Sequence, residues 1–115
     1  MQTVRRPPLI GSGIANASGV CEILFRPDSK NAARLLERIN IASDSTLTPE
    51  VFVYVGSNTS DENFVDYTPA GKRDVSVNEP AIWVPGSTPI LVRFTGCTVG
   101  ARCTVHIQNQ IELQN

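Results

Sequence analysis

The sequence predicts an all-β protein, built as an antiparallel sandwich or barrel. Between residues 51 and 100, short apolar runs alternate with turn residues at a spacing of roughly ten. In one run Val51, Val53 and Val55 would face one side of a strand, and Phe52 and Tyr54 the other. Short strands at this spacing are typical of sandwiches and barrels.

Length and composition indicate one globular domain without a nucleic-acid or membrane partner. A chain of 115 residues is the size of a single domain. Its net charge is −1 and it has no basic stripe, so binding to nucleic-acid phosphates is not expected. No apolar run reaches the ~18 residues of a membrane span, and the N-terminus lacks the apolar core of a signal peptide. The near-zero net charge favours self-association.

Residues 1–18 are expected to form an extended N-terminal arm, and residues 19–115 the sandwich domain. Pro7 and Pro8 fix an extended backbone. The small residues that follow offer little to pack: Gly11, Gly13, Ala15 and Ala17. We therefore expect this arm to lie against its own sheet or against a neighbouring subunit.

Seven segments are predicted to be strands: 19–26, 50–56, 63–67, 74–77, 81–84, 88–95 and 102–113. The last segment alternates over its length. Its apolar positions share one face: Cys103, Val105, Ile107, Ile111 and Leu113. Its polar positions share the other face, which is expected to be solvated or paired with another subunit: Thr104, His106, Gln108, Gln110 and Glu112.

Residues 31–43 are ambiguous from local pattern alone. Some of their apolar residues recur at helical spacing: Ala32, Leu35, Leu36 and Ile39. As a strand, the segment would instead place four residues on one face: Leu35, Glu37, Ile39 and Ile41. That strand would turn the carboxylate of Glu37 inward, so local propensity favours the helix.

The three cysteines, Cys21, Cys97 and Cys103, cannot all pair within one chain. Without a secretion signal, reduced and buried thiols are the default. A disulfide between Cys97 and Cys103 across a short loop is the alternative.

No residue pattern predicts a catalytic or metal site. His106 is the single histidine and falls on the polar face, with no nucleophile motif to activate, so we expect a surface histidine. A zinc site from Cys97, Cys103 and His106, with Cys21 as fourth ligand, would lack the paired C-x2-C spacing. No enzyme activity and no cofactor are expected.

Two further groups of side chains are candidates for ligand binding. Asp61, Glu62 and Asp66 do not match calcium-loop spacing, so a solvated hairpin loop is expected there. Trp83, together with Tyr54 and Tyr67, would suit a platform for sugar rings. Trp83 alone would suit a half-buried core position or an interface anchor.

Several motifs taken together resemble a known family. Residues 34–39 read RLLERI, residues 51–56 read VFVYVG, and residues 63–68 read NFVDYT. Gly71 and Asp74 follow, and then the segments WVPG at 83–86, FTG at 94–96 and GA at 100–101. This pattern resembles small structural proteins of tailed bacteriophages, mostly phages of actinobacteria, over residues 19–113.

The resemblance implies a jelly-roll-like sandwich that assembles on a virion, and it implies that residues 34–41 form a strand. We therefore expect a non-enzymatic capsid decoration protein, assembled in the bacterial host cytoplasm. Its expected partners are further copies of itself, as a symmetric trimer, and the major capsid protein or tail proteins of the phage. The expected contact residues lie in the arm and on a sheet face: Arg5, Arg6, Pro7, Pro8, Leu9, Ile10 and Trp83.

The alternative function is a tail-tip module. Such a module would bind host-surface glycan or other tail proteins, and it would need exposed aromatic residues clustered in a groove.

Overall fold

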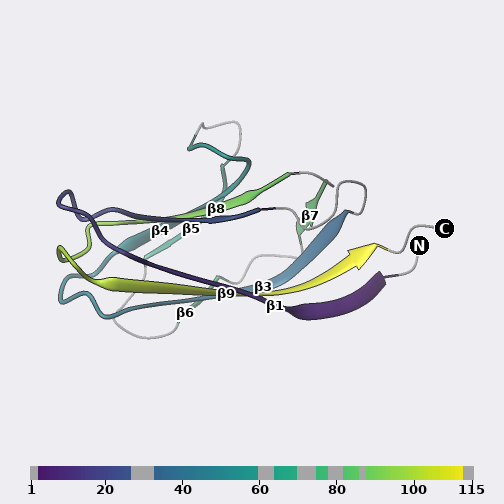
Figure 1. The fold of residues 1–115 in the computed structure, drawn as a ribbon, viewed down its shortest axis with the longest axis horizontal. Helices are drawn as coiled ribbons and strands as arrows, with labels where there is room; N and C mark the ends of the chain where they lie inside the picture. The colour runs from purple at the N-terminus through teal and green to yellow at the C-terminus, as the bar shows by residue number, and fades with distance from the viewer. Residues whose placement is uncertain are drawn as a thin grey trace.

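The computed structural model describes residues 3–26, 33–59, 64–69, 75–77, 82–85 and 88–112. These residues form nine strands in two facing antiparallel sheets (Figure 1), so the predicted all-β sandwich is confirmed. None of the described residues belongs to a helix long and apolar enough to cross a membrane.

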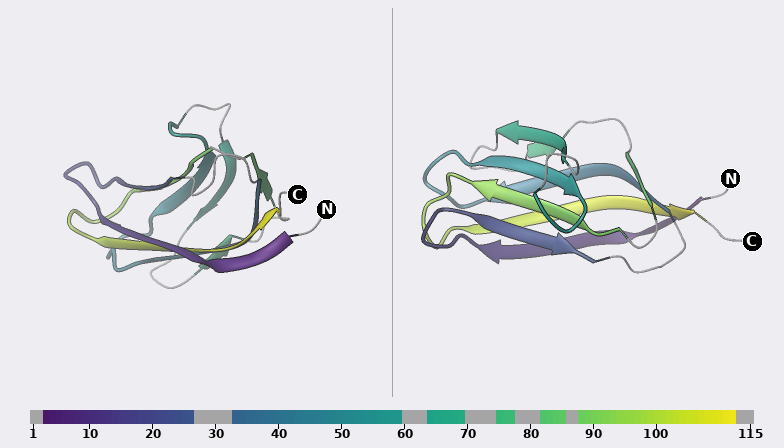
Figure 2. Two further views of the ribbon diagram at one scale, coloured as in Figure 1. Left: turned by 45° about the vertical axis from the view of Figure 1, so that its right-hand side comes forward. Right: turned by 90° about the horizontal axis from the view of Figure 1, so that it is seen from above.

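The first sheet, sheet A, has the order β1–β9–β3–β6, and β7 also pairs with β3. Its strands are β1 (Thr3–Ile14), β9 (Arg102–Glu112), β3 (Arg34–Ser43), β6 (Val75–Val77) and β7 (Ile82–Val84). The second sheet, sheet B, has the order β2–β8–β4–β5. Its strands are β2 (Cys21–Phe25), β8 (Ile90–Thr95), β4 (Glu50–Val55) and β5 (Phe64–Pro69). The chain passes between the sheets repeatedly, and β1 and β2 lie at edges on the same side of the sandwich (Figure 2).

The core fills the space between the sheets with the inward positions of each strand. In β9, Cys103, Val105 and Ile107 are fully buried, while Thr104 and His106 alternate toward the outer face, as predicted. Val51 and Val53 of β4 are equally buried on the facing sheet. The removal of these apolar side chains from water is the main favourable contribution to the free energy of folding.

Residues 34–43 form strand β3, so the helix that local propensity favours is wrong and the strand is right. The predicted strand face is wrong in its first half. A bulge between Leu36 and Arg38 shifts the register against β9, so Arg34 and Leu36 point inward before it. After the bulge Ile39 and Ile41 point inward, and Glu37 is not drawn into the core. The bulge thus allows residues 34–43 to form a strand without burying the carboxylate of Glu37.

The segment expected to be an arm is a strand of the sandwich. Residues Thr3–Ile14 pair antiparallel with β9, so of the two places foreseen for the arm, its own sheet is the one it occupies. The register shifts between Arg6 and Leu9, where Pro7 and Pro8 lie opposite β9 without amide hydrogens to donate. Leu9 packs against the core.

The glycines of β1 allow it to lie directly against β2. A β-carbon on Gly11 would meet Ile23 Cγ2 at 2.6 Å and Phe25 Cζ at 2.9 Å, and one on Gly13 would meet Cys21 Sγ at 2.8 Å. Gly11 and Gly13, which have no side chains to pack, therefore allow the edge strands β1 and β2 to approach each other closely.

We predict that Gly11→Ala lowers the free energy of unfolding by about 1–3 kcal/mol, because the new methyl group overpacks the contact with Ile23 and Phe25. Ser12→Ala, on the exposed side of the same strand, should change it by less than about 0.5 kcal/mol. Chemical denaturation measures both, and equal stabilities of the two variants would contradict the close approach.

Candidate functional site

The expected contact residues of the arm lie on the edge of sheet A. The backbones of Arg5 and Arg6 pair with Gln110 and Asn109, and their side chains lie outside the described part of the structure. Pro7 and Pro8 are exposed. Ile10 is 63% exposed and points outward, whereas Leu9 faces the core, so these two neighbouring residues do not share one exposed patch.

A buried asparagine that sequence reasoning missed supports the proline bulge. Asn109 occupies an inward position of β9 and is 1% exposed. Its Nδ2 donates to the backbone oxygens of Pro7, at 3.2 Å, and Ile107, at 3.4 Å. The bulge is therefore tied to a buried side chain by a part-buried hydrogen bond, while Asn109 Oδ1 has no hydrogen-bond partner among the described residues.

Of the three aromatic side chains, the two that the structure describes, Trp83 and Tyr54, do not form a platform together. Trp83 in β7 is 43% exposed and points out of sheet A, since its neighbour Val84 is buried. Tyr54 belongs to β4 of sheet B, where it is buried. The side chain of Tyr67 lies outside the described residues. The structure thus leaves Trp83 as an exposed residue at the end of sheet A and separates it from Tyr54.

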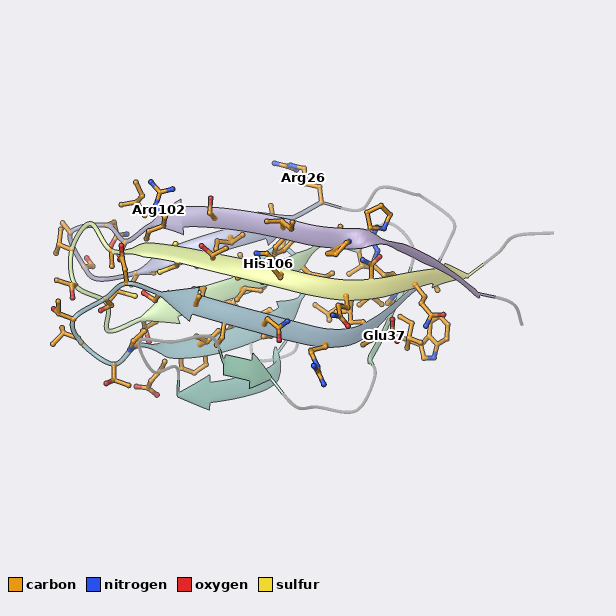
Figure 3. All side chains as sticks on the ribbon, turned by 90° about the horizontal axis from the view of Figure 1, so that it is seen from below. Arg26, Glu37, Arg102 and His106 are labelled. Carbon is orange, nitrogen blue, oxygen red and sulfur yellow. The ribbon has the colours of Figure 1, made fainter. Side chains whose placement is uncertain are left out.

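The candidate metal ligands are divided between the outer face of sheet A and the core between the two sheets. His106 lies on the outer face (Figure 3), whereas Cys21, Cys97 and Cys103 are buried. Within the described ranges no group of three histidine, cysteine or acidic side chains is placed to hold a metal ion. Asp61, Glu62 and the side chain of Asp66 fall outside those ranges.

The cysteines form a buried group of free thiols rather than a disulfide. Cys97 Sγ lies 3.9 Å from Cys103 Sγ, and Ser43 Oγ lies 3.6 Å from the latter. Burial, followed by the neighbouring Cys103, raises the pKa of both Cys21 and Cys97 to about 12. The thiols of Cys21 and Cys97 therefore stay protonated near neutral pH and act as small apolar core groups.

The loops at one end of the sandwich are bonded to each other through hydroxyl groups. The amide of Thr98 donates to Ser45 Oγ at 2.9 Å, and the amide of Thr46 donates to Thr98 Oγ1 at 2.8 Å. Ser45 Oγ also lies 3.0 Å from Thr98 Oγ1. This reciprocal pattern fixes loop 44–49 against loop 96–101, although the partners are more than 50 residues apart in sequence.

A third loop, residues 15–20, is joined to the same group. The amide of Ala15 donates to the oxygen of Ala101 at 2.8 Å, and the amide of Cys97 donates to the oxygen of Gly19 at 2.9 Å. Gly19 has φ +74°, and a β-carbon there would lie 2.6 Å from the oxygen of Cys97, so only glycine fits. We call the three loops 15–20, 44–49 and 96–101 the loop end.

The loop end presents apolar side chains to solvent. Leu47 is 57% exposed and Val99 65% exposed, and Ile14, at the entrance to the third loop, is 63% exposed. Apolar groups held outward on a fixed backbone favour binding, because little conformational entropy is lost on contact. Sequence reasoning missed them because the serine and threonine bonds that fix the loops link distant segments.

The outer face of sheet A is the second exposed surface. The registers of β1, β9 and β3 align its outward side chains in rows across the strands. The middle row consists of small residues, and two depressions of about 420 Å³ and 300 Å³ share Ala42 and Thr104 as lining residues. Figure 3 shows this face, with His106 at its centre.

Neither a protein-family model nor a curated protein sequence matches the chain. Among solved structures it is similar to the K3 cleaved adhesin domain of Lys-gingipain from Porphyromonas gingivalis w83, with 13% identity over 89% of this chain and 73% of that chain, and a TM-score of 0.42. It is also similar to the extra small virus particle of the prawn Macrobrachium rosenbergii, with 7% identity over 100% and 82% of the two chains, and a TM-score of 0.41. A CBM4 structure gives 10% identity, coverages of 90% and 94%, and a TM-score of 0.37. Scores this low carry no functional inference.

We predict that the free energy of unfolding falls as the pH rises from about 9 toward 12. The unfolded thiols lose their protons near the ordinary pKa of 9.0, whereas Cys21 and Cys97 in the folded protein do so only near 12. Between these values the unfolded state binds fewer protons, so high pH favours it. Denaturant titrations at several pH values should show a shallower decline for Cys21→Ala/Cys97→Ala, and an identical decline would contradict the assignment.

We predict that Thr98→Val loosens the loop end. The change removes the hydroxyl that accepts from the Thr46 amide, at a cost of about 1 kcal/mol. Amide hydrogen exchange at Thr46 should speed up about fivefold or more. Thr104→Val, on the outer face of sheet A, is the matched control and should leave this amide unchanged; unaltered exchange in Thr98→Val would refute the role of the hydroxyl.

Proposed function

We propose that this chain is a non-enzymatic structural protein of a tailed-phage virion, which binds the particle as a capsid decoration protein. The observation that carries the proposal is the loop end, where cross-bonded loops hold Leu47 and Val99 outward on a fixed backbone. A surface of this kind suits contact with another protein, because it buries apolar area without first having to order the loops.

The sequence resemblance supplies the virion context, and the surface chemistry agrees with a contact role. The loop end contains no charged side chain except Asp44, with Arg102 next to it. Depletion of charge around exposed apolar residues is typical of the centre of protein interfaces. Repetition of a modest contact over a capsid lattice would give firm attachment through effective concentration.

Self-association completes the proposal. Among the described strands, the outer face of sheet A and the edge strand β1 are both left open in one copy of the chain. A decoration protein that contacts its own copies as well as the capsid would connect neighbouring capsomers. The proposed partners are therefore the major capsid protein of the particle and further copies of this chain.

The experiment is a binding assay with particles of the phage that encodes the chain. Mass spectrometry of purified virions should detect the protein, and recombinant protein should co-sediment with particles depleted of it. Leu47→Asp and Val99→Asp should each reduce this binding at least about tenfold, because a charge is buried without a partner.

Leu24→Asp, which changes an exposed leucine of sheet B, is the matched control and should bind normally. Protein confined to infected-cell extracts and absent from purified virions would refute the proposal. Retention on a host cell-wall glycan array, lost in Trp83→Ala, would favour the tail-tip alternative instead.

A further inference from the structure

The outer face of sheet A is built as a set of parallel rows. Residues opposite one another in the register share a row, because paired residues of antiparallel strands project to the same side. The first row is a ridge of larger side chains: Ile10, His106 and Asn40. The second row consists of small side chains: Ser12, Thr104 and Ala42. The row beyond it is again larger: Ile14, Arg102 and Asp44.

The small row forms a hollow between the two larger rows. The depression of about 420 Å³ extends from Ala42 and Thr104 toward Asn40 and His106. The depression of about 300 Å³ extends from the same two residues toward Asp44 and Arg102. A ridge and a hollow therefore run side by side across the strands.

Charges of opposite sign on this face are separated along the line of β3. Arg38 lies within the strand and Asp44 directly follows it; both are exposed, and they are six positions apart, which is roughly 20 Å. Within the described part of the chain Arg38 forms no ion pair, and Asp44 accepts only the backbone amide of Arg102, at 2.7 Å. Between these two residues β3 presents the uncharged Asn40 and Ala42.

We propose that this face binds a second copy of the chain across a two-fold axis. The axis lies in the interface, outside sheet A and parallel to the line of Gly11, Val105 and Ile41, which are paired across the three strands. Rotation about it places the ridge of each copy over the hollow of the other. The same rotation brings Arg38 of each copy opposite Asp44 of the other, because Ile41 is midway between them. Shape and charge are thus complementary under one operation.

The proposed pairing of Arg38 with Asp44 is compatible with the twist of β-sheets. Facing sheets pack at about 30°, which displaces a residue roughly 10 Å from the axis by about 5 Å. An extended arginine side chain spans that displacement. The face measures roughly 20 Å by 15 Å, which is smaller than a standard interface, so the pair should dissociate in the micromolar range or weaker.

This inference names the self-contact of the proposed function, as a two-fold pair in place of the trimer expected from the resemblance, and rests on that function only for its biological setting. The test therefore uses purified protein without particles. Sedimentation equilibrium between about 1 and 500 µM should show a monomer–dimer equilibrium for the natural chain. Arg38→Asp and Asp44→Arg should each weaken self-association at least about tenfold, because both ion pairs become repulsive.

An equimolar mixture of Arg38→Asp and Asp44→Arg should recover the dimer. One variant then carries a carboxylate at both positions and the other a guanidinium at both, so every facing pair is again oppositely charged. Arg26→Asp carries the same charge change away from this face (Figure 3) and should dimerise normally. Since Asp44 also accepts the Arg102 amide, Ala42→Arg, which fills the hollow, provides a further variant that should remain monomeric.

Circular dichroism melting should establish that each variant is folded. A natural chain that is monomeric throughout this range, or charge variants that associate as it does, would overturn the proposed face. Failure of particle binding with an intact dimer would instead count against the virion role alone.

Discussion

Strand β9 is the constraint on which the rest of the structure depends. It pairs over almost its whole length with both β1 and β3, so its alternation fixes the direction of side chains in three strands at once. Its inward residues Cys103, Val105 and Ile107 are fully buried at the centre of the core. A slip of one residue would move all three to solvent, which ties the core and the outer face to a single register.

Both neighbours of β9 carry a bulge at the same level, and this preserves that register. The irregularity in β1 lies opposite Gln108, and that in β3 lies opposite Gln108 and Asn109. The bulge in β1 leaves Pro7 and Pro8, which have no amide hydrogen, out of the hydrogen-bond ladder. The bulge in β3 keeps the carboxylate of Glu37 from pointing into the core. Asn109 is buried between them and bonds to the backbone of Pro7. Figure 1 shows the strands of sheet A curving toward the end of the molecule where both termini lie, and bulges increase local bending of this kind.

Alternation along single strands could be predicted from the sequence, and features that depend on distant partners could not. The faces of β9 and β4 follow from period-two patterns within one segment. The role of Gly11 and Gly13 does not, because it depends on β2 lying directly against them. The bulge of β3 is likewise defined by β9, and the loop end by bonds between Ser45 and Thr98. The sequence of the proline- and glycine-rich segment 1–18 therefore predicts an arm, because the apolar side chains that pack against its glycines belong to β2.

The two proposed contact surfaces constrain one another. A two-fold axis across the strands reverses their direction, so the two copies of a pair would carry their loop ends at opposite ends. The chain measures 48 Å along its longest axis, which sets the scale of that separation. One pair could therefore not place both loop ends on a single compact site. It would instead join two sites on a particle, and weak contacts at each site would reinforce one another through the link. In the proposed virion role, the antiparallel pair would therefore connect neighbouring coat subunits.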